Sequence, residues 1–236
     1  MLDGSMTNKK FHTKAEEHLH TREHFRGLVT KQFLSHHEDV NVLVASMHEI
    51  VASMVSFLAD QDISKIKNGD YIVKLVASFC RSYFIAADLT LCGELTDAAV
   101  IVRKQMELLA RLNELAADLD VNSLINKTPQ LRYLKGALQK QYGAYSKVAH
   151  SSSLEGMILL GETVTDDGVF TPLHPVFQEN AYVSLHHLFL TELGFFMWAM
   201  EFYRKHFPNY DNTYDLRYFF LVVDRHQKIF PKSRSA

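Results

Sequence analysis

Apolar residues recur at three- and four-residue steps along almost the whole chain, and this spacing constrains the fold more than any other feature. Such a period places apolar side chains on one face of an α-helix. Only five prolines interrupt the 236 residues, so the helices can be long. The sequence therefore predicts an all-α fold, a helical bundle of about seven helices.

The breaks in this pattern give the expected element boundaries. Asn68-Gly69 breaks the chain and Asp70 is the expected cap of the following helix. The predicted helices cover residues 14–34, 39–59, 70–91, 96–118, 129–150, 176–206 and 214–229. Residues with β-branched side chains flank Asp166-Asp167-Gly168, which predicts one small β-hairpin near residues 157–172.

Composition limits the class of protein. The 47% hydrophobic content suits one domain over residues 6–236, while residues 1–5 resemble a leader added ahead of a natural start at Met6. Lys and Arg number 25 against 27 Asp and Glu, so no global positive field favours nucleic acid, although a local basic patch could.

Two features bear on the cellular location. Cys80 and Cys92 are the only cysteines, which favours a reducing, cytoplasmic compartment. The most apolar stretch, residues 180–200, approaches membrane-spanning length but contains polar residues that are costly in hydrocarbon, such as His186 and Glu192. We therefore expect a central helix of a soluble bundle and no membrane.

The predicted helix over residues 96–118 carries the first candidate site residues. Arg103 and Glu107 are one turn apart and lie opposite its apolar arc, with Glu114 in the same row. They could form an ordinary ion pair on a solvated face. They could instead face a cleft, where a guanidinium holds a phosphate or carboxylate and a carboxylate orients a histidine.

The predicted helix over residues 129–150 supplies that histidine. Ser146 and His150 share a face, with Tyr142 and Tyr145 near it, and a short connection makes this helix an antiparallel neighbour of the preceding one. A histidine in a last turn is also favoured by the helix dipole without any function. The candidate catalytic residues are His150, Arg103 and Glu107, and the candidate binding residues are Tyr142, Tyr145 and Ser146.

The segments RKQMELLARL (103–112) and YGAYSKVAHSS (142–152), with the hairpin and apolar helix that follow, resemble an uncharacterised bacterial all-helical family. Its members carry an R-x-x-x-E helix and an S-x-x-x-H helix. This family is similar in turn to the HEPN (higher eukaryotes and prokaryotes nucleotide-binding) bundles. Some of these are metal-independent ribonucleases that use an arginine and a histidine, usually across a dimer interface.

The resemblance implies that His150 stands where the HEPN histidine stands, in a chain that binds or processes RNA or nucleotides in bacterial defence or stress response. HEPN nucleases place the arginine four to six residues before the histidine, where this chain has no arginine, so Arg103 of the neighbouring helix is the candidate substitute. The alternative is a non-catalytic interaction or dimerisation module. A homodimer is expected, because the helix over residues 176–206 has too many large apolar residues for a one-sided surface helix.

Histidine is frequent, with 13 in the chain, and several lie in EEHLHTREH (16–24) and HHED (36–39). Glu16, His20 and His24 share one helix face, and Glu17 with His20 matches half of a di-iron carboxylate pattern. The second half is missing, so we expect a solvated face and neither a metal nor a cofactor. The chain also lacks a Gly-rich phosphate loop, a G-x-S-x-G elbow and a C-x-x-C pair.

Overall fold

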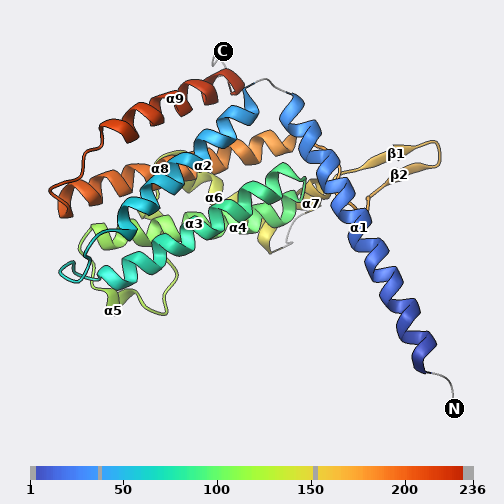
Figure 1. Cartoon of the computed structure of the whole chain (residues 1–236), viewed down its shortest axis with the longest axis horizontal. Coiled ribbons are helices and arrows are strands. Elements are labelled where there is room, and N and C mark those ends of the chain that lie inside the picture. The colour runs from blue at the N-terminus through green and yellow to red at the C-terminus, as the bar shows by residue number, and fades with distance from the viewer. Residues whose placement is uncertain (1–3, 37–38, 151–153, 231–236) are drawn as a thin grey trace.

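The computed structural model describes residues 4–36, 39–150 and 154–230. Within them the protein is an all-α bundle with one β-hairpin, which confirms the predicted fold class (Figure 1). The longer helices are α1 (Gly4–His36), α2 (Val40–Ala59), α3 (Gly69–Leu91), α4 (Leu95–Ala116), α6 (Ala137–Ala149), α8 (Asn180–His206) and α9 (Thr213–Ile229). Two helices of four residues lie in the connections, α5 (Val121–Leu124) and α7 (Leu154–Met157).

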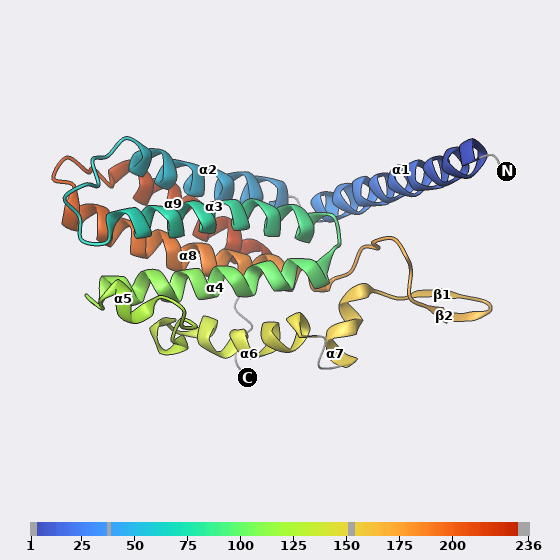
Figure 2. The ribbon, with the colours of Figure 1, turned by 90° about the horizontal axis from the view of Figure 1, so that it is seen from below.

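The core lies between α2, α3, α4 and α8, which run side by side along the bundle (Figure 2). It is built from the apolar faces that the helical spacing predicts. Phe79 of α3 stacks on Phe195 of α8 with ring centroids 4.3 Å apart. The buried Tyr203 hydroxyl donates to the Met54 carbonyl at 2.7 Å, which joins α8 to α2. On the outside of this core, α9 packs against α2 and α6 packs against α4.

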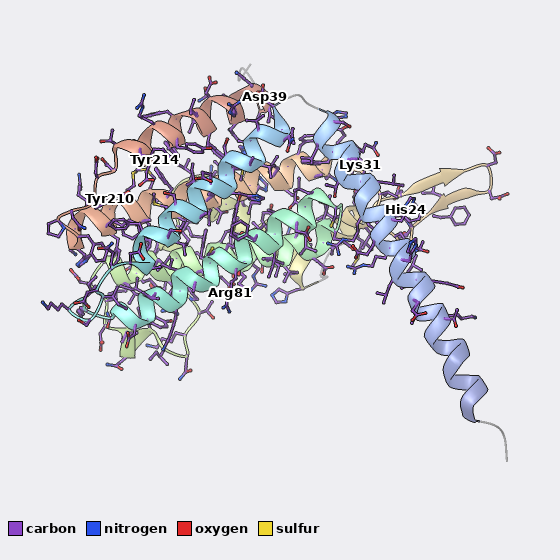
Figure 3. All side chains as sticks on the ribbon, viewed as in Figure 1. His24, Lys31, Asp39, Arg81, Tyr210 and Tyr214 are labelled. Atoms are coloured by element: carbon purple, nitrogen blue, oxygen red, sulfur yellow. The ribbon has the colours of Figure 1, made fainter. Side chains whose placement is uncertain are left out.

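Polar contacts join α9 to α2 near both of its ends, where Figure 3 labels Tyr210 and Asp39. Asp215, in the first turn of α9, accepts hydrogen bonds from Ser53 of α2 and from Tyr210, each at 3.0 Å. Near the other end of α9, Arg225 lies 3.7 Å from the carboxylate of Asp39, which precedes α2. These contacts hold α9 on the face of the bundle remote from α6.

The N-terminal half of α1 and the hairpin project from the same end of the bundle (Figures 1 and 2). Strand β1 (Thr163–Thr165) pairs with β2 (Gly168–Phe170) in antiparallel register. The turn is the predicted one, and Gly168 adopts φ +136° there, a conformation that favours glycine. The strands are shorter than the predicted span, because Ile158–Leu160 form a 3-10 turn that packs against α4.

Four predicted boundaries are wrong in detail. The helix expected from residue 14 begins at Gly4. The helix expected from residue 129 begins at Ala137, because Gly136 has φ +63° and a short 3-10 turn precedes it. The helix expected from residue 176 begins at Asn180. Asp70 lies inside the first turn of α3 rather than capping it, since Asn68 is the N-cap residue. Of the expected leader, residues 1–3 lie outside the described residues.

Among the described residues, α2 is the one helix whose length and composition would allow it to cross a membrane. Core helices of globular proteins have the same properties, and α2 buries Leu43, Met47, Ile50 and Met54 in the bundle. The α8 segment considered in the sequence does not meet the same criteria.

Candidate functional site

The structure brings Arg103, Glu107, Tyr142 and His150 together, where α4 and α6 lie against each other. Arg103 and Glu107 are one turn apart on α4, Tyr142 lies in the middle of α6, and His150 follows its last residue. The guanidinium Nη1 of Arg103 is 3.0 Å from Nε2 of His150. The register that the sequence required between these two helices is therefore present. We call these four residues the Arg103 cluster.

Tyr142 links the two charged groups of the Arg103 cluster. Its hydroxyl donates to Glu107 Oε1 at 2.6 Å and accepts from Arg103 Nε at 3.2 Å. Arg103 Nε also lies 3.2 Å from Glu107 Oε1, as the predicted ion pair. Burial and the bond to Glu107 raise the pKa of Tyr142 above its ordinary value, so the phenol stays protonated and remains a donor.

The contact with Arg103 gives His150 the role of acceptor. A guanidinium can only donate, so Nε2 of His150 accepts the hydrogen bond from Nη1. One of the two alternatives that the sequence left open was that the Glu107 carboxylate orients His150. That detail is wrong in this structure, because Arg103 makes the contact with His150 and Glu107 is bonded to Tyr142 and Arg103.

Both charged groups of the α4 pair are partly open to solvent. The side chains of Arg103 and Glu107 are 22% and 27% exposed, and His150 is exposed. Lys104 and Glu107 also line an adjoining hollow of about 210 Å³, together with the Tyr71 side chain. The arrangement can therefore be reached by a ligand that carries a phosphate or a carboxylate.

Tyr145 lies apart from the Arg103 cluster, although the sequence grouped it there. It is buried toward α8, and its hydroxyl lies 2.8 Å from Nδ1 of His187. Burial raises the pKa of Tyr145 well above its ordinary value and lowers that of His187 to about 4. Ser146 is half-buried one turn before His150, and its carbonyl accepts the His150 backbone N–H at 3.1 Å. The serines at 151–153 lie outside the described residues.

A buried ion pair close to the Arg103 cluster was not predicted from the sequence. Arg111 and Glu114 are 4% and 0% exposed, and their charged groups are 2.8 Å apart. Glu114 also accepts the backbone N–H of Gln130 at 2.7 Å, and Arg111 donates to the carbonyl of Lys127. The sequence placed Glu114 on the same helix face as Arg103 and Glu107. In the structure the connection between α4 and α6 covers this face at Glu114.

The histidines considered as metal ligands stay dispersed in the described part of the chain. His20 and His24 lie on α1, where Figure 3 labels His24, and both are exposed or half-exposed. Across residues 4–36, 39–150 and 154–230, no three His, Cys, Asp or Glu side chains group closely enough to hold a metal ion. His37 and Glu38 of the second histidine-rich segment lie outside those residues.

Comparison with family models, with curated proteins and with solved structures finds no match to this chain. The resemblance to HEPN bundles therefore stays a prediction from the sequence.

Proposed function

We propose that the protein binds RNA or nucleotides through the Arg103 cluster, as an HEPN-like bundle. The observation that carries this proposal is the contact between Arg103 and His150, which brings a guanidinium and an imidazole from two helical segments to one solvent-accessible place. An arginine and a histidine are the pair that the HEPN resemblance implies, here with the arginine on the neighbouring helix.

The donors of Arg103 suit a phosphate group. The described contacts use Nε and Nη1, and the Nη2 hydrogens are available for a phosphate oxygen. The guanidinium carbon lies 5.4 Å from the Tyr142 ring centroid, which fixes the plane of the guanidinium. Lys104, on the rim of the adjoining hollow, adds a second positive charge for the nucleic-acid backbone.

Cleavage without a metal would require His150 to act as a base. His150 would take the proton of a ribose 2′-hydroxyl, whose oxygen forms a bond to phosphorus while the bond from phosphorus to the 5′-oxygen breaks. The 5′-oxygen would then take a proton from water. Because Arg103 occupies Nε2 of His150, a bound phosphate must first draw the guanidinium away. Binding without cleavage needs no such movement.

A homodimer is part of this proposal. Exposed apolar side chains lie on α1 and at the hairpin, where Leu28 is 47%, Phe170 51% and Leu173 82% exposed. Clusters of exposed apolar residues mark protein interaction surfaces. Light scattering should give close to twice the 27.1 kDa of one chain, and the single-chain mass at micromolar concentration would contradict the dimer.

The same exposed apolar side chains favour a second candidate, an interaction module without catalysis. In that case the Arg103 cluster is structural and joins α4 to α6, since Glu107 already balances the charge of Arg103. Removing Arg103 would then lower stability and change no RNA affinity.

Fluorescence anisotropy with a labelled single-stranded RNA separates the two candidates. Arg103→Ala should weaken binding about tenfold to a hundredfold, since a charge-assisted hydrogen bond contributes about 1.5–3 kcal/mol. The matched control is Arg217→Ala, which removes an exposed arginine from α9 on the other side of the bundle and should change the affinity less than about twofold. Equal affinities of wild type and Arg103→Ala would refute RNA binding at this site.

A further inference from the structure

A second pocket, separate from the Arg103 cluster, lies between α4, α8 and the start of α6. Its volume is about 330 Å³, at the lower end of the range for small-molecule sites. None of the four residues of the Arg103 cluster lines it. Ligand binding in this pocket therefore does not depend on the proposed RNA or nucleotide binding at the Arg103 cluster, and it can be tested separately.

The walls of the pocket are mostly apolar. Leucine side chains from all three helices form the floor and sides, and Met197 lies at the surface with 53% of its area exposed. Gly194 lets the helices come close, because a Cβ there would lie 2.6 Å from Leu109 Cδ2. Such walls favour the apolar body of a ligand over water.

The polar groups of the pocket come from Asn113 of α4, from Trp198 and Glu201 of α8 and from the beginning of α6, where its positive charge lies. Gly136 is the N-cap residue, so no side chain caps the first backbone N–H groups of this 13-residue helix. The adjacent Lys135 is exposed and carries a positive charge. An uncapped helix N-terminus and a lysine together favour one negatively charged group.

Trp198 of α8 also lines the pocket, and it is 4% exposed. Glu201 also lines the pocket, and its carboxylate disfavours a second negative charge on the same ligand.

We propose that this pocket binds a small amphipathic monocarboxylate, with the apolar body among the leucines and the carboxylate at Lys135 and the start of α6. One carboxylate is preferred to two because of Glu201. The occupant is thus defined by an apolar body that fills about 330 Å³ and by a single negative charge.

Trp198 is the only tryptophan in the chain and lines both this pocket and a neighbouring one beside Ile72, so its emission reports binding, and the charge variants below assign that binding to this pocket. Decanoate, added to the full-length protein below its micelle concentration, should shift this emission and reach saturation. Decanol has the same chain without the charge and should bind about fivefold to tenfold more weakly. A change that never saturates, or equal binding of decanoate and decanol, would overturn the proposal without any variant.

Three charge variants sharpen this test. Lys135→Glu should weaken decanoate binding about fivefold to tenfold, and Glu201→Gln should strengthen it. Lys74→Glu is the matched control, because Lys74 is exposed on α3, away from the start of α6, and does not line the pocket, and it should leave the affinity unchanged. Circular dichroism verifies that each variant is folded. Equal weakening by Lys135→Glu and Lys74→Glu would contradict the placement of the carboxylate.

Discussion

Replacing Glu114 by alanine should destabilise the protein strongly. The carboxylate is fully buried, pairs with the buried Arg111 at 2.8 Å and accepts the Gln130 backbone N–H at 2.7 Å. Its removal leaves a buried guanidinium without its counter-charge and a backbone N–H without its acceptor. Breaking a buried ion pair in this way costs about 3–5 kcal/mol of the free energy of unfolding.

Urea unfolding followed by circular dichroism measures this loss. For a chain of this length the same change should lower the melting temperature by about 6–20 °C. The double variant Arg111→Met, Glu114→Met removes both charges and should be more stable than Glu114→Ala, because no uncompensated charge remains. Glu49→Ala, at an exposed position of α2, is the control and should change stability by less than about 0.5 kcal/mol. A loss below about 1 kcal/mol for Glu114→Ala would refute this reasoning.

Acid should destabilise the fold through two histidines, His187 and His226, whose pKa values burial lowers to about 4. In the unfolded chain these histidines take up protons near pH 6.5, whereas in the folded protein they stay neutral down to about pH 4. The stability that they contribute is therefore complete above pH 6.5 and is lost as the pH falls toward 4. At pH 5 each histidine should have lost about 1 kcal/mol of the free energy of unfolding after solvent screening. A melting temperature that does not fall between pH 7 and pH 5 would contradict this. Gly69→Ala should cost about 1–3 kcal/mol in urea unfolding, because the new Cβ would lie 2.5 Å from the Ile63 carbonyl oxygen. Gly143→Ala, with open space around it in α6, should instead stabilise by about 0.4–1 kcal/mol, and a loss there would show that the helix needs glycine.

The helices were predictable because their signal is local. Apolar spacing and glycine or proline breaks identified the seven longer helices, and the Asp166-Asp167-Gly168 turn identified the hairpin. The start of α6 was not predictable in the same way. After Pro129 the sequence has no strong helix breaker before Gly136, and the segment is held by a distant contact, in which Glu114 accepts the backbone N–H of Gln130.

The sequence predicted only the part of the candidate site in which one face of α4 lies against one face of α6. Helical spacing placed Arg103 with Glu107, and the sequence expected a short connection to set the next long helix beside α4. The two helices are neighbours and His150 contacts Arg103, but residues 117–136, with α5 and a 3-10 turn, join them. Spacing alone could not show that Tyr145 turns toward His187 of α8, since that depends on where a helix distant in sequence packs. It likewise could not separate Glu114, which the connection covers, from Glu107, which stays partly exposed.

The most direct measurement of the central claim is incubation of the purified protein and of His150→Ala with a mixed RNA pool, each with and without EDTA. For an RNA-processing site, wild type should cut RNA equally with and without chelator, because the proposed chemistry uses His150 and no metal. His150→Ala should not cut, and its melting temperature should stay within a few degrees of wild type, since an exposed last-turn histidine contributes about 0.3–1 kcal/mol. Wild-type protein that neither binds nor cuts RNA would contradict the account and leave the interaction module in its place.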